Sequence, residues 1–269
     1  MITKTLVFHF YIYNSPDYFN NIAYKFHMLC LKRYAHAFDK ACFNLACDNI
    51  EDKETINRIK HELIDCGFNN IEIIVTQNDQ FCEVNTFNYF IKNKLGTTSD
   101  LIFFAHTKGI CNVIDGVNFP ENILYWIWTL YYFNLEDEYI KNMKMRLVHA
   151  YGGHEDTFYG TCRIFVPDYS CSFYSGTFYW INAMKLYEDD KQGIIRLPNQ
   201  YNRAWCEKLP TVYKDPDNAY KGVASLYNRY IDKGNFYEWN DWAAIAEHFA
   251  CGKGNEDYLK GFNEIREQI

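Results

Sequence analysis

A short polar segment in the middle of the chain carries side chains suited to binding an anion. Residues 101–105 (Leu-Ile-Phe-Phe-Ala) have the composition of a buried strand, and His106, Thr107, Lys108 and Gly109 follow directly. In an open α/β sheet, ligands bind at the carboxyl ends of the strands. A lysine supplies a compact positive charge there, and a glycine permits close approach of the backbone. We therefore expect Lys108 to bind a phosphate group. The alternative is an ordinary surface lysine, and His106 either donates to the same phosphate or faces the core.

A second segment offers groups that could take up a proton. Residues 151–156 read Tyr-Gly-Gly-His-Glu-Asp and follow an expected strand over residues 146–151. When a hydroxyl group attacks a substrate, a carboxylate or an imidazole has to accept its proton. His154, Glu155 and Asp156 all qualify by residue type. The alternative for each is a place in an acidic surface loop with glycine turns.

Polar residues also end the first two expected strands, over residues 5–13 and 41–47. Tyr13 and Asn14 lead into an expected helix, with Ser15 as its N-cap and Pro16 at its first position. A helix N-terminus suits an anion or a polar base. Asp48, at the end of the second strand, could accept from a nucleobase N–H or a ribose hydroxyl. Alternatively, these residues simply cap neighbouring helices.

Residues 173–180 (Phe-Tyr-Ser-Gly-Thr-Phe-Tyr-Trp) form the last candidate segment. The turn Ser175-Gly176-Thr177 offers backbone N–H donors, and Tyr179 and Trp180 could form a platform for a sugar ring. Alternatively, these aromatic side chains pack a helix over residues 180–187 onto the sheet. If the sheet is parallel, the ends of the first, second and fourth strands and residues 152–180 should converge.

The first half of the chain alternates strand-like and helix-like patterns. Strands are expected over residues 5–13, 41–47, 71–76 and 101–105, and apolar stripes with helical spacing separate them. Gly67 and Gly96 are expected to end the second and third helices. Four strand-then-helix units with short connections require a parallel sheet with right-handed crossovers.

The second half is less regular. A helix is expected from Pro120 and Glu121 to about Met143, aromatic on nearly all sides and therefore sandwiched between layers. Further strands are expected over residues 146–151 and 161–166. Helical stripes follow later in the chain, at Tyr220, Val223, Tyr227 and Ile231 and at Trp242, Ile245 and Phe249.

The composition excludes several classes of protein. With a net charge of −7 and no long basic run, the chain lacks the signature of a nucleic-acid-binding protein. Its ten cysteines contain no Cys-x-x-Cys pair and predict free thiols in a reducing cytoplasm, with no zinc site. No signal peptide is recognisable. The apolar run over residues 123–133 is too short to span a bilayer and predicts a buried helix, with peripheral membrane contact as the alternative.

Several of these motifs together resemble a known family. The sequence His-Thr-Lys-Gly after an apolar strand, the residues Trp126 and Trp128, the segment Ser-Gly-Thr-Phe-Tyr-Trp and the late Ala-Glu-His-Phe at residues 246–249 are similar to motifs of bacterial glycosyltransferase-like proteins of polysaccharide biosynthesis, as for capsule or lipopolysaccharide. The resemblance covers nearly the whole length. Thr177 and Tyr179 depart from it, because the family pattern has an asparagine and a tryptophan there.

The resemblance implies a GT-A-like, mostly parallel α/β fold, a nucleotide-diphosphate sugar as donor and a glycan or lipid-linked acceptor. It places His106 and Lys108 on the donor side and Ser175, Gly176, Tyr179 and Trp180 on the acceptor side, and it adds Asn88 near the donor and Glu247 on a late helix. A single domain over residues 1–269 is expected, with a nucleotide-binding half (1–110) and an acceptor-side half (111–269).

GT-A enzymes commonly hold a divalent metal with an Asp-x-Asp motif, and here that place reads His106-Thr107-Lys108. The oxygen ligands that magnesium or manganese prefers are missing. We therefore expect no resident cofactor and cationic side chains in place of the metal. The rival interpretation is a catalytically inactive carbohydrate- or nucleotide-binding scaffold. A nucleotidyltransferase is less consistent with the sequence, because no glycine-rich phosphate loop follows the first strand.

Overall fold

Most of the chain is described by a computed structural model. It covers residues 2–98, 100–107, 109–110, 121–148, 156–166, 171–174, 177–194, 197, 206, 209, 223–230 and 254–269. Lys108, His154, Glu155, Ser175, Gly176 and Glu247 lie outside these residues, as does the helical stripe expected at Trp242, Ile245 and Phe249.

The first half of the chain alternates strands and helices, as expected. The elements are β1 (Lys4–Ile12), a 3-10 turn (Tyr18–Asn20), α1 (Ile22–Tyr34), a second 3-10 turn (Ala35–Ala37), β2 (Lys40–Cys47), α2 (Lys53–Ile64), β3 (Ile71–Gln77), α3 (Glu83–Phe90), a third 3-10 turn (Lys92–Lys94) and β4 (Leu101–His106). All four predicted strands are confirmed, and Gly67 and Gly96 adopt positive φ where the second and third helical segments end. The expected helix start at Ser15 is wrong, because α1 begins after Asn21.

The second half contains α4 (Glu121–Leu135), α5 (Asp137–Leu147), β5 (Phe158–Val166), β6 (Cys171–Tyr174), β7 (Tyr179–Asn182), α6 (Ala183–Lys191), β8 (Val223–Tyr230) and α9 (Gly254–Arg266). The strand expected over 161–166 is confirmed within β5. Four other expectations are wrong, and each fails where tertiary pairing or a local break overrides the sequence pattern.

The helix expected to run to Met143 is interrupted, because Glu136 has the extended ψ of 147° and starts a new helix, α5. That helix continues to Leu147, where a strand from Arg146 was expected. Trp180 lies in a strand, and helix α6 begins only at Ala183. The segment around Val223 and Tyr227 is also a strand, since it pairs with β5 over most of its length.

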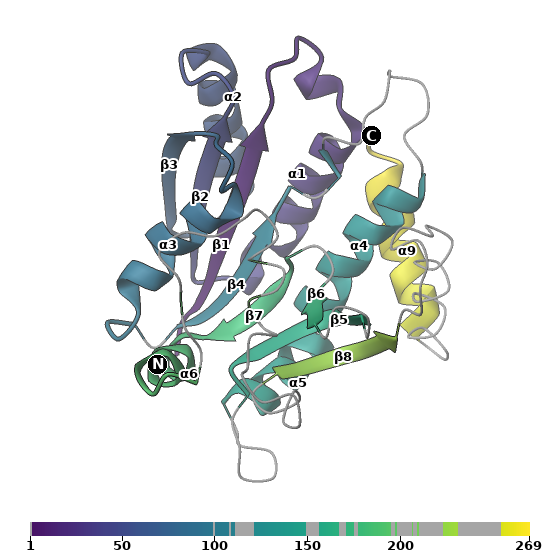
Figure 1. Cartoon of the computed structure of the whole chain (residues 1–269). Coiled ribbons are helices and arrows are strands. Elements are labelled where there is room, and N and C mark those ends of the chain that lie inside the picture. Colours follow the sequence, from purple (N-terminus) through teal and green to yellow (C-terminus); the bar gives the residue numbers. More distant parts are fainter. Residues whose placement is uncertain are drawn as a thin grey trace.

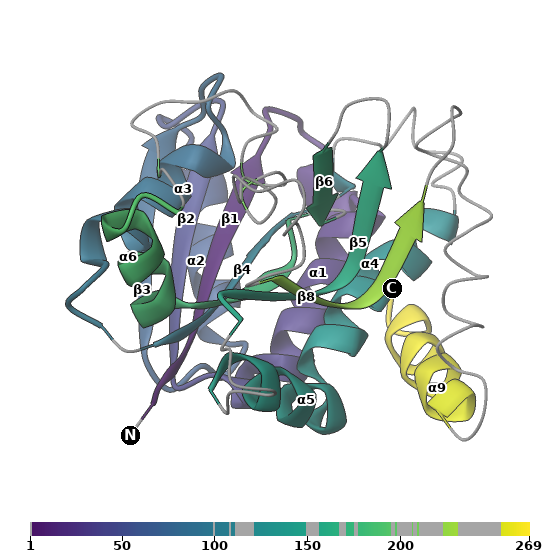
Figure 2. The same ribbon diagram turned by 60° about the horizontal axis from the view of Figure 1, so that its bottom comes forward.

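In the described part of the chain, eight strands form one mixed sheet (Figures 1 and 2). The order is β3-β2-β1-β4-β7-β5-β6, and β8 pairs with β5. Strands β3, β2, β1 and β4 are mutually parallel, whereas β7 is antiparallel to both β4 and β5. Because β8 pairs in parallel along most of β5, strands β6 and β7 share its other edge. The expected α/β class is thus confirmed.

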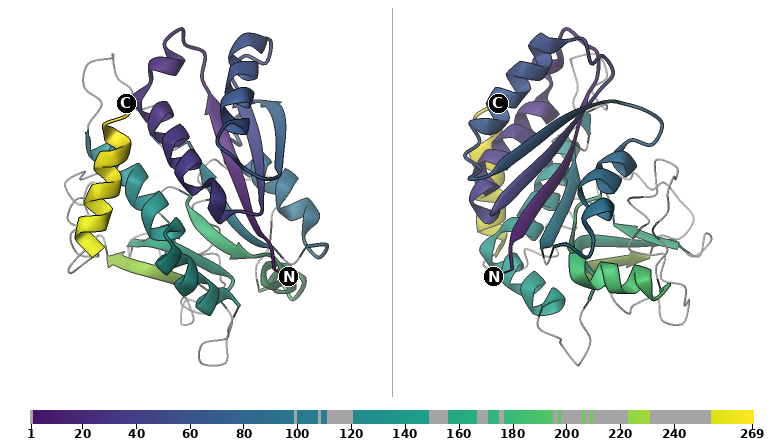
Figure 3. Two further views of the ribbon diagram at one scale, coloured as in Figure 1. Left: turned by 180° about the vertical axis from the view of Figure 1, so that it is seen from behind. Right: turned by 90° about the vertical axis from the view of Figure 1, so that its left-hand side faces the viewer.

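Helices cover both faces of this sheet, as the edge-on view of Figure 3 shows. On one face, α1, α2, α4 and α9 bury a core that includes Phe8, Phe43, Phe103 and Trp128. On the other face, α3 and α6 cover a smaller core around Val7, Phe87, Phe104, Tyr179 and Leu186. Strand residues contribute alternately to the two cores, because successive side chains of a strand point to opposite faces.

Helix α4 is sandwiched as expected. Its described apolar residues between 123 and 133 are nearly all buried, including Ile127 and Trp128 at 0% exposure. This confirms burial of that run. Within the described residues, no helix combines the length and the apolar character that crossing a bilayer requires.

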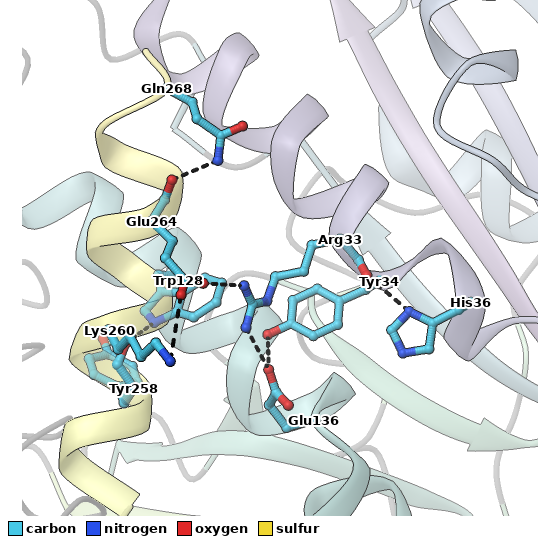
Figure 4. Close-up of polar contacts among 9 residues, drawn as sticks. All are labelled: Arg33, Tyr34, His36, Trp128, Glu136, Tyr258, Lys260, Glu264 and Gln268. Carbon is cyan, nitrogen blue, oxygen red and sulfur yellow. Dashed lines mark hydrogen bonds and ion pairs between the residues drawn. The ribbon is translucent and has the colours of Figure 1, made fainter.

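A polar cluster fastens the last helix, α9, onto α1 and α4 (Figure 4). Arg33 of α1 forms ion pairs with Glu264 of α9 (Nη1–Oε2, 3.0 Å) and with Glu136 (Nη2–Oε1, 3.6 Å). The indole Nε1 of Trp128 donates to the carbonyl of Tyr258 at 2.9 Å. A Cβ on Gly261 would lie 2.6 Å from the Trp128 ring, so this close contact requires glycine.

Candidate functional site

The strand order creates a point where the chain connections diverge at the carboxyl ends of β1 and β4. From β1 the chain crosses through α1 to β2 on one side, and from β3 it returns through α3 to β4 on the other side of β1. Helices α1 and α3 cover opposite faces (Figure 3). In doubly wound sheets, ligands bind in the crevice at such a switch point. The sheet therefore directs attention to His106 and its neighbours.

A buried pair of titratable side chains lies at the end of β4. The Nδ1 atom of His106 is 2.6 Å from Oε1 of Glu83, in the first turn of α3, and the two side chains are only 13% and 9% exposed. Burial raises the pKa of Glu83, but the charge of His106, their hydrogen bond and the charge of His9 outweigh it and lower the pKa to about 2. Glu83 is therefore a carboxylate at neutral pH.

Each partner of this pair also keeps an unused polar atom. Nε2 of His106 and Oε2 of Glu83 are buried, and within the described chain neither has a hydrogen-bond partner. Leaving a buried polar atom unsatisfied costs about 1–3 kcal/mol. Two such atoms in one ion pair therefore suggest a site that is completed by a ligand.

The backbone is strained on both sides of the pair. Among the described residues other than glycine, only Cys82 (φ 45°) and Thr177 (φ 53°) have positive φ. Cys82 directly precedes Glu83. Thr177 directly precedes Phe178, whose ring lies against that of His106 with centroids 6.1 Å apart. Strain of this kind is concentrated at functional sites in proteins.

A network of hydrogen bonds lies beneath α3, next to the pair. The hydroxyl of Thr86 lies 2.8 Å from Nδ1 of His9 and accepts from Nδ2 of Asn44, also at 2.8 Å. Thr76 donates to Oδ1 of Asn44 at 2.9 Å. Sequence reasoning missed Glu83, His9, Asn44 and Thr86. For His9 and Asn44, the available signal was a polar residue at matching positions of the apolar strands β1 and β2. Glu83 and Thr86 lie on helix α3, where this signal does not apply.

The ends of β1 and β2 lie at the same edge of the sheet. Asp48 is exposed, and its carboxylate accepts from the Tyr11 hydroxyl at 2.8 Å and from Nδ2 of Asn78 at 3.1 Å. The backbone N–H of Tyr11 donates to the Thr107 hydroxyl at 3.0 Å, which joins this edge to the end of β4. The expected convergence of strands one, two and four is therefore observed.

The N-terminus of α1 is already occupied by the protein's own side chains. Buried Asn21 accepts from the N–H groups of Ala23 and Tyr24, and its amide donates to the Tyr13 hydroxyl (2.9 Å) and to the carbonyl of Ile110 (2.8 Å). Tyr13 and Asn14 were expected to lead into a helix end with free backbone N–H groups. This expectation is wrong for the N–H groups of Ala23 and Tyr24, which Asn21 accepts. Asn14 itself is exposed.

Gly109 is needed for close packing within the protein. Its φ is +79°, and a Cβ there would lie 2.6 Å from Cγ2 of Ile123 in α4. The sequence suggested that Gly109 allows the close approach of a ligand. In the structure, helix α4 of the protein itself approaches this closely. Asn88, on α3, has a buried Oδ1 for which the described residues provide no partner.

Asp156 lies at the opposite end of the sheet from His106. The N–H of Asn182 bonds the carbonyl of Thr157, and Asn182 pairs with Leu101, the first residue of β4. His106 is five residues further along, roughly 16 Å at the rise of a strand. Asp156 instead forms an ion pair with Arg146 (Oδ2–Nε, 2.8 Å). The expected convergence of Asp156 with the strand ends is wrong.

Tyr179 and Trp180 belong to the core and offer no open platform. Both are 0% exposed. The Tyr179 hydroxyl donates to the carbonyl of Cys206 at 2.8 Å, and Nε1 of Trp180 donates to the carbonyl of Asn134 at 3.1 Å. The alternative expectation, that these aromatic residues pack a helix over residues 180–187 onto the sheet, is wrong as well, because both residues lie in strand β7 of the sheet and are buried there. Of this segment, Phe178 lies against His106, with ring centroids 6.1 Å apart, and Thr177 directly precedes it.

Cysteine and metal chemistry add little to this picture. Cys30, Cys42, Cys47 and Cys66 are buried and form no disulfide. In the part of the chain that the structure covers, His, Cys, Asp and Glu side chains form no group of three or more that could hold a metal ion.

No protein-family model matches the sequence, and no curated protein matches it. The function therefore has to be argued from the site itself.

Proposed function

We propose that this protein is a GT-A-like glycosyltransferase, which moves a sugar from a nucleotide-diphosphate donor to a glycan or lipid-linked acceptor without a bound metal ion. The observation that carries the proposal is the meeting of Tyr11, Asp48 and His106 at the β1–β4 switch point. In the sequence, Lys108 stands between Thr107 and Gly109, which follow the end of β4 at the same edge of the sheet.

The proposed roles follow from charge and position. Tyr11 and the exposed Asp48 lie where a nucleoside binds in doubly wound folds. Lys108 stabilises the departing diphosphate, so that positioning and electrostatics lower the barrier. The motifs His-Thr-Lys-Gly and Ser-Gly-Thr-Phe-Tyr-Trp resemble those of bacterial glycosyltransferase-like proteins. This resemblance supports a sugar as the transferred group and a glycan or lipid-linked molecule as the acceptor. A cytoplasmic location is proposed on the basis of the reduced cysteines.

Calorimetric titration with UDP and GDP, each with and without EDTA, tests this function. We expect binding that EDTA does not change and that weakens at least tenfold in Lys108→Ala. The matched control is Lys141→Ala, since Lys141 is exposed on α5, away from the strand ends. Absence of binding in the wild type would reject the proposal. Binding without any sugar transfer or donor hydrolysis would instead identify an inactive nucleotide-binding scaffold.

A further inference from the structure

The Glu83–His106 pair has the geometry of an oriented base. Nδ1 of His106 is bonded to the carboxylate, and Nε2 on the other side of the ring has no partner among the described residues. A carboxylate on one ring nitrogen fixes the tautomer and the orientation of an imidazole, and it leaves the second nitrogen ready to accept a proton. A surface histidine without such a partner has neither property.

The pair is less suited to neutralising a diphosphate. With a carboxylate beside the imidazole, the pair carries no net positive charge, and Oε2 of Glu83 would repel phosphate oxygens. Oε2 of Glu83 is an acceptor without a partner among the described residues, and the Thr177 hydroxyl is likewise buried without one. These two groups match the donor and acceptor properties of a hydroxyl group better than those of a phosphate. Asp156 lies at the wrong end of the sheet for the task.

We infer that His106 is the general base of the proposed transfer and that Glu83 is the residue that positions it. This inference rests on the proposed function and assigns the proton transfer within it. The acceptor hydroxyl oxygen forms a bond to C1 of the donor sugar while the bond from C1 to the β-phosphate oxygen breaks. The nucleoside diphosphate leaves with the electron pair, and the hydroxyl proton moves to Nε2 of His106.

Access is part of the inference. Nε2 of His106 has almost no exposed surface, so atoms that now cover it must be displaced when the acceptor binds. Among the described residues, His9 from β1 is a further titratable group that interacts with this pair.

The test compares Glu83→Gln and His106→Ala with wild type, using nucleoside diphosphate release from UDP- and GDP-sugars, with water as the acceptor. We expect kcat to fall about 10²–10⁴-fold in both variants, while the Kd for the nucleoside diphosphate stays within about threefold. Glu54→Gln is the matched control, an exposed glutamate in the first turn of α2.

Nitrogen-15 chemical shifts of His106 provide a readout that does not depend on activity. At pH 8 we expect the proton on Nδ1 and none on Nε2. The opposite tautomer, an unchanged kcat in Glu83→Gln, or a loss of nucleotide affinity without loss of kcat would each overturn the inference. Failure of the wild type to bind any nucleotide would reject the proposed function first, so the two failures can be told apart.

Discussion

His9 and His106 lie directly opposite each other on the parallel strands β1 and β4, and Glu83 from α3 interacts electrostatically with both imidazoles. This places two imidazoles and one carboxylate within a nearly closed layer between helix and sheet. His9 is also tied to Thr86, which shares its hydroxyl with Asn44. The stability and the chemistry of this layer are therefore coupled.

Stability should depend on pH through Glu83. Its pKa in the folded protein is about 2, below the ordinary 4.5, so the stabilisation is complete above about pH 4.5 and is lost as the pH falls towards 2. The shift corresponds to about 3 kcal/mol in the free energy of unfolding. Urea unfolding between pH 2 and 6 measures it. In Glu83→Gln this dependence should become flatter, and an equally steep dependence would refute the assignment.

Thr86→Val should destabilise the fold by about 2–4 kcal/mol, because it leaves the side chains of His9 and Asn44 buried without their shared partner. Thr86→Ser keeps the hydroxyl and should cost only about 1 kcal/mol for the lost methyl group. Chemical denaturation of the two variants checks the difference. Equal losses would mean that packing of the methyl group matters more than the hydrogen bonds.

Gly109→Ala should destabilise the protein by about 2–3 kcal/mol, through strain at positive φ and contact of the new Cβ with Ile123. The control is Gly67→Ala, because Gly67 has a similar φ of +89° but nothing within 4 Å of an added Cβ. Only the cost of the backbone conformation, about 1 kcal/mol, is expected there. Thermal unfolding of both variants separates the contact from the strain.

Asp156→Asn should lower stability and leave sugar transfer unchanged. The side chain is 10% exposed and paired with Arg146, so the loss of its charge is expected to cost about 1–3 kcal/mol. Its position at the amino end of β4 keeps it away from the proposed reaction. Donor hydrolysis measured beside denaturation tests this separation. A large fall in kcat with normal stability would restore Asp156 as a candidate base.

The amino-acid sequence by itself determined the parallel half of the sheet. Apolar runs such as residues 101–105 and helical stripes such as Ile56, Ile59 and Leu63 are local patterns, and their alternation leaves few topologies open. His106 and Asp48 were recognisable for the same reason, since polar residues that follow a buried strand lie at its carboxyl end. Local periodicity decided less in the second half, where Trp180 and Tyr227 lie in strands held by pairing with distant segments.

Only the tertiary structure decided which side chains meet. Glu83 comes 23 positions before His106 and belongs to another element, so no spacing in the sequence connects them. Asp156 had a suitable residue type, but the antiparallel register of β7 places it at the far end of the sheet. Contacts of this kind depend on strand order and on the face that each helix covers, and these are properties of the whole packed chain.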